Sequence, residues 1–182
     1  GAIHIRPDER QQINFWHMDH SFREFPTPIL ALYARLLPPV GGDTLFTSLE
    51  AAYDGLSSRI KESIEGLPCY HRVTTTQNTK RRHTREEAEA MAKAPPVIHP
   101  LVGLNPDNGR KFLFVNVPIY CRSIVEMPTA EGDMLLNKLY QHVQRPEFHV
   151  RIVWRENTIV IWENVHCLHY PVADYFPHER KL

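Results

Sequence analysis

The tripeptide His17-Met18-Asp19 places an imidazole and a carboxylate two residues apart. In an extended segment, side chains two positions apart point to the same face, so both groups could bind one metal ion while Met18 points away. The same spacing also arises by chance, and surface pairs of histidine and aspartate are ordinary. The tripeptide therefore predicts a metal site only if a third ligand comes from another part of the chain.

His169 is the best candidate for that third ligand, because it follows an apolar, strand-like segment that ends at Trp162. Two histidines and one carboxylate form the ligand set that holds ferrous iron in oxygenases and leaves coordination positions open. Such an open site implies redox chemistry with O2 and an organic electron donor.

A zinc site made by His166, Cys167 and His169 is an alternative, since the two histidines are three residues apart. A structural zinc ion takes four protein ligands, usually in a tighter pattern. We therefore expect the set that includes His17 and Asp19 to be the functional one.

A dicarboxylate electron donor would need a fixed cation for its far end. Arg180 lies eleven residues after His169. Its guanidinium could bind a carboxylate through two parallel hydrogen bonds in a dry pocket. Considered alone, Arg180 would be interpreted as a surface arginine, but beside the three metal-ligand candidates it is a candidate cosubstrate anchor.

The segments that must position these residues have the pattern of a mixed domain that is mainly β-structure. Fifteen prolines against eight glycines are typical of short strands joined by shaped loops. Apolar and alternating runs predict strands at residues 29–37, 111–117, 148–154 and 158–162, the last buried on both faces. A turn at Glu156-Asn157 should join the last two as a hairpin in a sandwich or barrel, with helices packed outside.

Capping signals predict several helices. Capping-box patterns at Thr47-x-x-Glu50 and Thr84-x-x-Glu87 each predict a helix start, and another helix should begin at Ser57 or Ser58 and end at Gly66. Between residues 129 and 143, apolar residues recur at spacings of three and four, which predicts a helix with one core-facing stripe. The stripe comprises Leu135, Leu136, Leu139 and Val143.

Length and charge limit the classes of function. With 182 residues, 42% of them hydrophobic, we expect residues 1–182 to form a single domain with an apolar core. The 21 basic residues balance the 21 acidic ones, so no global field draws in nucleic acid or a membrane surface. No segment reaches the ~20 apolar residues of a membrane helix. A basic cluster at residues 80–85 is expected to be a solvated face.

The three cysteines, Cys69, Cys121 and Cys167, stand far apart and show no C-x-x-C spacing. This pattern predicts neither a disulfide framework nor a thiolate zinc site, and it fits a reducing cytoplasm. Most of the eleven histidines, His71 and His99 among them, have no spacing typical of a metal pair. We expect those histidines to have no role in chemistry.

Ordered sequence blocks resemble the taurine dioxygenase family of iron(II)/2-oxoglutarate-dependent oxygenases. The similarity covers nearly the whole chain, and several blocks in one order are more specific than any single motif. The blocks are Phe15 to Phe22, Leu37 to Phe46 with its Gly-Gly-Asp-Thr run, His99 to Val102, Leu113 to Asn116, Arg145 to Phe148, Ile161 to Asn164, and His169-Tyr170 with Asp174-Tyr175 before Arg180.

The resemblance implies that His17, Asp19 and His169 bind Fe(II), and that Thr44 and Arg180 hold the distal carboxylate of the cosubstrate 2-oxoglutarate. It implies a double-stranded β-helix, a jelly-roll-like core with flanking helices, whose N- and C-terminal parts lie outside residues 1–182. The implied reaction uses O2 to hydroxylate a small anionic substrate. An organosulfonate such as taurine would then release sulfite and leave an aldehyde.

The same resemblance leaves the substrate open. An aryloxyalkanoate, a sulfate ester or a biosynthetic amino acid would suit the same chemistry, and an inactive metal- and ligand-binding module is the alternative from another class. Ile13, His20 and Tyr120 are candidate substrate contacts, of which Ile13 replaces a usual polar residue and His20 a small apolar one. Relatives often self-associate, so a homo-oligomer is one expected assembly.

One departure from the family pattern lies after the tryptophan of the last strand. The family's usual Asp-Asn-Arg is Glu163-Asn164-Val165 here. We expect a local ion pair or hydrogen-bond anchor to be missing at that point.

Overall fold

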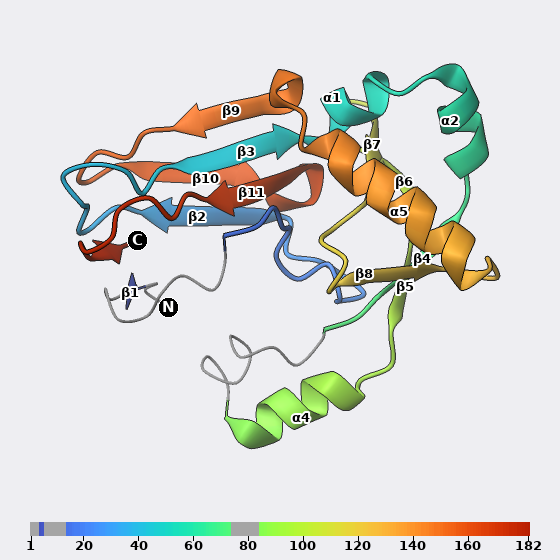
Figure 1. The fold of residues 1–182 in the computed structure, drawn as a ribbon, viewed down its shortest axis with the longest axis horizontal. Coiled ribbons are helices and arrows are strands. Elements are labelled where there is room, and N and C mark those ends of the chain that lie inside the picture. The colour runs from blue at the N-terminus through green and yellow to red at the C-terminus, as the bar shows by residue number, and fades with distance from the viewer. Residues whose placement is uncertain (1–3, 6–13, 74–83) are drawn as a thin grey trace.

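Two antiparallel sheets face each other in one half of the molecule, and helices with a second group of strands form the other half (Figure 1). The computed structural model describes residues 4–5, 14–73 and 84–182. The architecture is mixed and consists mostly of strands, as the sequence predicts. Most of the basic cluster at 80–85 lies outside the described residues.

The facing sheets carry the residues of interest. The first sheet has the order β11–β3–β9 and the second pairs β10 with β2. Ring centroids of Phe46 on β3 and Trp162 on β10 lie 5.2 Å apart, so the inner sides of the two sheets contact each other. The strands are β2 (Ile29–Tyr33), β3 (Thr44–Ser48), β9 (His149–Ile152), β10 (Ile159–Glu163) and β11 (Cys167–Pro171).

The predicted hairpin between the strands at 148–154 and 158–162 is wrong. β9 pairs with β3, whereas β10 pairs with β2, so the turn at Glu156-Asn157 carries the chain from one sheet to the other. The prediction that 158–162 is buried on both faces is also wrong, because Ile159 and Ile161 are 61% and 67% exposed. Only the inner side of β10 meets the other sheet, so apolar content alone does not report two-sided burial.

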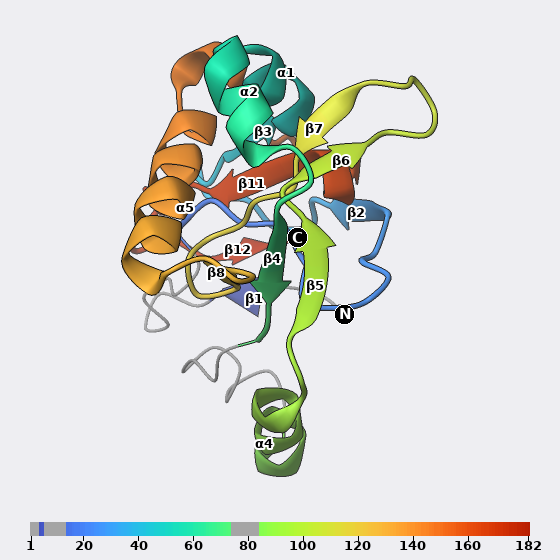
Figure 2. The ribbon, with the colours of Figure 1, turned by 90° about the vertical axis from the view of Figure 1, so that its right-hand side faces the viewer.

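The other described strands form three further sheets (Figure 2). β4 (Pro68–His71) lies between β5 (Val97–Pro100) and β8 (Cys121–Ile124), and β6 (Val102–Leu104) pairs with β7 (Lys111–Leu113). β1 (His4–Ile5) pairs with β12 (Arg180–Lys181). The helices are α1 (Leu49–Asp54), α2 (Ser58–Ile64), α4 (Arg85–Lys93) and α5 (Thr129–Val143), with short 3-10 turns at Pro146–Phe148 and Asn164–His166.

The main core lies where α1 and α5 pack against β7, β8 and β11. Three of the four stripe residues of α5 are buried, namely Leu136, Leu139 and Val143. α4 stands beyond the ends of β4 and β5 in both views. None of the helices in the described part of the chain has the length and apolar character that a membrane crossing requires.

Helix starts follow their capping residues. Ser57 caps α2 and Thr84 caps α4 through a complete capping box with Glu87, as predicted. α1 differs, because Ser48 accepts the hydrogen bond from Ala51 N and is the N-cap in place of Thr47. The Thr47 hydroxyl instead donates to the carbonyl of Val143 and ties β3 to the end of α5.

Three predicted strands are shorter than expected, among them β9, which covers 149–152 instead of 148–154. β7 ends at Leu113, although the next four residues are buried, and β2 ends at Tyr33 instead of residue 37. The segment after β7 leaves the sheet because Asn116 bonds to a distant loop, as described below.

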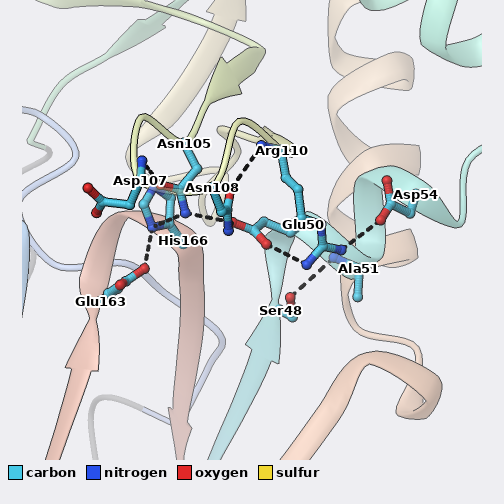
Figure 3. A network of polar contacts seen from close by, with 10 residues as sticks. All are labelled: Ser48, Glu50, Ala51, Asp54, Asn105, Asp107, Asn108, Arg110, Glu163 and His166. Carbon is cyan, nitrogen blue, oxygen red and sulfur yellow. Dashed lines mark hydrogen bonds and ion pairs between the residues drawn. The ribbon is translucent and has the colours of Figure 1, made fainter.

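A buried carboxylate ties α1 to the β6–β7 turn (Figure 3). Glu50 Oε1 accepts hydrogen bonds from Asn105 Nδ2 at 2.7 Å and Asn108 Nδ2 at 3.0 Å, and Oε2 lies 2.7 Å from Arg110. Arg110 also pairs with Asp54 at 2.7 Å. Burial alone would raise the pKa of Glu50, but the two amide hydrogen bonds and the Arg110 charge outweigh burial and lower it.

Replacing this carboxylate should therefore destabilise the fold. In Glu50→Gln an amide replaces the oxygen that faces Arg110, and we expect a loss of about 1–3 kcal/mol in the free energy of unfolding at pH 7. The folded-state pKa is lowered, so the Glu50 contribution is present above its ordinary pKa of 4.5 and is lost as pH falls through the lower folded value. Urea unfolding at pH 7 and at low pH tests this, with the exposed Glu62→Gln on α2 as control. Equal losses in both variants at pH 7 would contradict it.

Candidate active site

A two-residue bridge joins the loop before β2 to strand β11. His17 N donates to the carbonyl of His169 at 3.0 Å, and His169 N donates to the carbonyl of His17 at 2.8 Å. Directly opposed residues of an antiparallel pair project their side chains to the same side. The two imidazole rings accordingly lie with centroids 4.1 Å apart.

Asp19 completes a cluster of three donor groups. One ligand atom each of His17, Asp19 and His169 lies within 4.8 Å of the others, and His17 Nε2 is 3.8 Å from Asp19 Oδ1. That distance is too long for a hydrogen bond. It suits two ligands of one ion, because donors about 2.1 Å from a metal lie about 3–4 Å apart. Met18 points away into the core and is 1% exposed.

The two imidazoles can each offer a ring nitrogen to an ion. The Nδ1–H of His17 donates to the carbonyl of Phe15 at 3.0 Å, which leaves Nε2 facing Asp19. Burial, with a smaller effect of His17, lowers the pKa of His169 to about 3 and so keeps that ring neutral. The Nδ1 atom of His169 is buried and has no hydrogen-bond partner among the described residues. Two imidazoles and one carboxylate arranged in this way fit a divalent metal ion.

Two buried asparagines bond to the backbone of the segment from His17 to Asp19, which we call the ligand loop. Asn116 Oδ1 accepts from Met18 N at 3.1 Å, and its Nδ2 donates to the Met18 carbonyl at 2.9 Å. Asn164 does the same for Asp19, with Oδ1 accepting from Asp19 N at 3.2 Å and Nδ2 donating to the Asp19 carbonyl at 2.9 Å. Asn164 also bonds to the carbonyl of Thr27. These contacts fix where the Asp19 carboxylate points.

A buried cation on β12 lies beside the Thr44 end of β3. Arg180 is 4% exposed, and among the residues that the structure describes no carboxylate forms an ion pair with it. Burial lowers the pKa of Arg180, because the loss of hydration disfavours the charged guanidinium. Its Nη2 donates to Thr44 Oγ1 at 3.0 Å, and Trp154 Nε1 donates to the same oxygen at 3.0 Å.

These contacts leave the Thr44 hydroxyl with a donor role. A hydroxyl has one proton to donate and two lone pairs that accept. Arg180 and Trp154 occupy both lone pairs, so the Thr44 proton is the part that remains for a further partner. Thr44 and Arg180 therefore offer only donors to that partner, which is the requirement for binding an anion.

The glycine pair before Thr44 permits this arrangement. Gly41 and Gly42 both have positive φ, at 80° and 75°, and a side chain on Gly41 would clash with Asp174. Asp174 Oδ1 accepts from Gly42 N at 2.7 Å, and a Cβ on Gly42 would press on the Arg180 and Tyr175 side chains. The close approach of this turn to the segment before β12 brings Thr44 to Arg180.

The candidate substrate residues are less closely grouped. His20 Nδ1 bonds to Thr27 Oγ1 at 2.8 Å, and burial lowers the His20 pKa. Tyr120 contacts Phe22, with ring centroids 5.8 Å apart, and Phe22 contacts His20 in turn. Ile13 lies outside the described residues.

The alternative zinc set is not assembled. Among the described residues, His166 and Cys167 join no three-donor cluster with His169. His166 Nδ1 lies 2.7 Å from Glu163, and the Cys167 thiol donates to the Glu163 carbonyl. In the segment 163–165, Glu163 has His166 as partner and Asn164 is fully hydrogen-bonded, so the anchor expected to be missing would be one made at Val165.

Three residues that bond to the ligand loop or to Thr44 were not predicted from the sequence. They are Asn116, Asn164 and Trp154. Asparagine in a loop is ordinary, and nothing in the spacing shows that residues 98 and 145 positions away bond to the ligand loop. The one available signal was the place of Asn116 and Asn164 inside the blocks that carry the family resemblance, and Trp154 lies outside those blocks.

Comparison with known proteins gives one consistent family. The family model described as "Taurine catabolism dioxygenase TauD, TfdA family" matches residues 3–182. An alpha-ketoglutarate-dependent 2,4-dichlorophenoxyacetate dioxygenase of Burkholderia sp. (strain RASC) is 36% identical over 154 residues, covering 85% of this chain and 51% of the relative. An alpha-ketoglutarate-dependent sulfonate dioxygenase of Saccharomyces cerevisiae is 30% identical over 170 residues, covering 92% and 40%.

A solved structure agrees with these matches. The crystal structure of AAD-2 in complex with Mn(II) and N-oxalylglycine superposes with a TM-score of 0.76 at 32% identity, over 92% of this chain and 66% of that one. The chain spans about half the length of the curated relatives that it matches.

The asparagine contacts predict a positioning effect on metal binding. Asn164→Ala removes the hydrogen bonds that orient Asp19, so Mn²⁺ affinity should fall about 10–100-fold, as for other groups that orient metal ligands. Titration followed by the EPR signal of free Mn²⁺ measures this, with the thermal midpoint recorded in parallel. Asn137→Ala on the exposed side of α5 is the matched control. Unchanged affinity in a folded Asn164→Ala protein would refute the role given to Asn164.

Proposed function

The chain belongs to the TauD, TfdA family, and on that basis we propose that it is an Fe(II)- and 2-oxoglutarate-dependent dioxygenase. The facing sheets would be the double-stranded β-helix core of one dioxygenase domain. His17, Asp19 and His169 would hold the iron, and Thr44 with Arg180 would hold the distal carboxylate of 2-oxoglutarate.

The single observation that carries this proposal is a cluster of two histidines and a carboxylate beside a buried arginine with no carboxylate partner among the described residues. His169 on β11 pairs with Phe46 on β3, and Thr44 is two residues further along β3. Two strand residues span about 7 Å. A five-carbon dicarboxylate could therefore reach from the metal ligands to Thr44 and Arg180 while both of its ends find charged or polar partners.

Fe(II), when bound, would supply the redox chemistry that couples O2 to decarboxylation of 2-oxoglutarate and oxidation of a substrate C–H bond. The protein's own residues would position the metal ligands and the cosubstrate and would exclude water from the site. Asn116 and Asn164 fix the ligand loop, and the Thr44 and Arg180 donors orient the cosubstrate. Trp162 and Phe46 cover His169, with ring centroids 5.4 and 6.1 Å from it, and keep water from that side of the site.

We propose a small organic anion as substrate, with an organosulfonate as the first candidate. The similar yeast protein is a sulfonate dioxygenase. Hydroxylation of the carbon next to a sulfonate would consume one O2 and one 2-oxoglutarate, give succinate and CO2, and leave a hydroxysulfonate. Loss of sulfite from that product would leave an aldehyde. The 36% identity to the 2,4-dichlorophenoxyacetate enzyme favours an aryloxyalkanoate as the second candidate.

Turnover assays test this proposal directly. Protein supplied with Fe(II), 2-oxoglutarate, ascorbate and air should form succinate, and a sulfonate panel that includes taurine should yield sulfite in a one-to-one ratio to succinate. Succinate with a phenoxyacetate but without sulfite would replace the first candidate by the second. Absence of succinate with every acid, together with no decarboxylation in the absence of substrate, would overturn the proposed activity in favour of an inactive binding module.

The anchoring role of Arg180 gives a separate prediction. Arg180→Ala removes charge-assisted hydrogen bonds of about 1.5–3 kcal/mol, so the 2-oxoglutarate concentration for half-maximal rate should rise about 10–100-fold. Arg180→Lys keeps the charge but loses the planar guanidinium, so its 2-oxoglutarate concentration for half-maximal rate should lie between those of the wild type and Arg180→Ala. Arg145→Ala, a surface arginine paired with Glu147, serves as control. An unchanged 2-oxoglutarate requirement in Arg180→Ala would show that the dicarboxylate binds elsewhere.

A further inference from the structure

A second cluster of metal-ligating side chains lies away from the histidine and aspartate site. Cys69 and His71 are on β4, and Cys121 begins the neighbouring strand β8. His71 pairs directly with Cys121, and a register shift lies between Tyr70 and His71. Residues two apart on a strand share a face, so the chain brings three ligand atoms to one point although the sequence separates them by up to 52 residues.

The three groups are close and fully enclosed. Cys69 Sγ and Cys121 Sγ are 3.1 Å apart, and one nitrogen of His71 lies within 4.8 Å of both. The exposed fractions are 0%, 0% and 3% for Cys69, His71 and Cys121. Both thiols are free rather than disulfide-bonded. Two thiolates bound to one tetrahedral ion at about 2.3 Å are separated by about 3.8 Å, so the two sulfur atoms would move apart slightly from their 3.1 Å spacing when an ion binds.

His71 is the observation that points to a ligand. Neither of its ring nitrogens makes a well-formed hydrogen bond to a described residue, although the ring is fully buried. A buried polar group without a partner costs about 1–3 kcal/mol, and such a group in a native protein calls for an explanation. A ring nitrogen that ligates an ion no longer lacks a partner.

The charges also balance for a divalent metal ion. A bound metal ion displaces the protons of thiol ligands, so Cys69 and Cys121 would both bind it as thiolates. Two thiolates and a neutral imidazole make a neutral unit around Zn²⁺ and a unit of charge −1 around Cu⁺. The neutral complex is the less costly one to bury beside Phe114.

We propose that Cys69, His71 and Cys121 form a buried binding site that gives three protein ligands to a thiophilic d10 metal ion, Zn²⁺ or Cu⁺. Cu⁺ would need no further ligand, whereas Zn²⁺ would take a water molecule as its fourth. Thiolate and imidazole ligands select these ions, whereas the site of His17, Asp19 and His169 has only nitrogen and oxygen donors. The two sites therefore differ in chemistry and can be loaded and observed separately.

Metal in this site would stabilise the segment that holds the ligand loop. Cys121 N donates to the carbonyl of Val117 at 3.0 Å, and Asn116, which clamps Met18, directly precedes Val117. The ion would tie β4 to β8 at Cys121, directly after the turn that begins at Val117. Loading with Zn²⁺ should accordingly raise the thermal midpoint of the wild-type protein.

Cobalt titration of the reduced, metal-free protein is the decisive experiment. Under anaerobic conditions, one equivalent of Co²⁺ should produce intense near-ultraviolet thiolate-to-cobalt absorption, and Zn²⁺ should then abolish it by displacement. Cu⁺ is tested by competition against a Cu⁺-specific chelator. Asp19→Ala should retain the thiolate absorption, so a failure of the proposed dioxygenase activity would leave this result unaffected.

Variants assign the absorption to its ligands. Cys69→Ser and Cys121→Ser should lose it and His71→Gln should weaken Co²⁺ binding at least tenfold, whereas Cys167→Ser, which removes the remaining cysteine, should leave it intact. If a buried substitution prevents folding, the cobalt titration of the wild-type protein still tests the proposal. Absence of thiolate absorption together with no retention of Zn²⁺ or Cu⁺ would overturn the proposal. Loss of two titratable thiols on exposure to air, with no metal bound before it, would also overturn the proposal and indicate a disulfide pair.

Discussion

The reciprocal hydrogen bonds between His17 and His169 are the constraint on which the candidate site depends. Each such bond contributes only about 1 kcal/mol net, so the bridge is too weak to hold the loop by itself. The residues beside His17 supply the rest, since Trp16 and Met18 are 6% and 1% exposed and a fully buried side chain of this size contributes about 1.5–3 kcal/mol. Because successive side chains of an extended segment point to opposite faces, Met18 lies in the core while His17 faces His169.

Around this bridge, the molecule accepts arrangements that cost stability. Arg180 is buried without a carboxylate partner among the described residues, and two imidazoles and a carboxylate stand within 4.8 Å of one another. Burying an unpaired charge is unfavourable in isolation. Both features become intelligible together, because a metal ion would satisfy the three ligand groups and a dicarboxylate would satisfy the guanidinium. Local conflicts of this kind are expected to concentrate at functional sites.

The sequence predicted the helices better than the sheets. Capping residues and apolar periodicity are local signals, and they located α2, α4 and α5, while α1 began one residue later than its capping pattern suggested because Ser48 is the N-cap. Strand pairing is not local. Nothing within residues 148–162 shows that β9 pairs with β3 and β10 with β2, and the exposed faces of Ile159 and Ile161 depend on that pairing. The meeting of Cys69 with Cys121, and of Asn116 and Asn164 with the ligand loop, depends on it in the same way.

Anomalous X-ray diffraction from a crystal grown with Mn²⁺ and 2-oxoglutarate tests the central claim most directly. Data collected on the high- and low-energy sides of the manganese absorption edge would locate the ion without reference to any assumed ligand. The account predicts one strong peak between the side chains of His17, Asp19 and His169, with 2-oxoglutarate density extending from it to Thr44 and Arg180. An ordered crystal with no peak there, or with the three side chains turned away from the manganese, would contradict it.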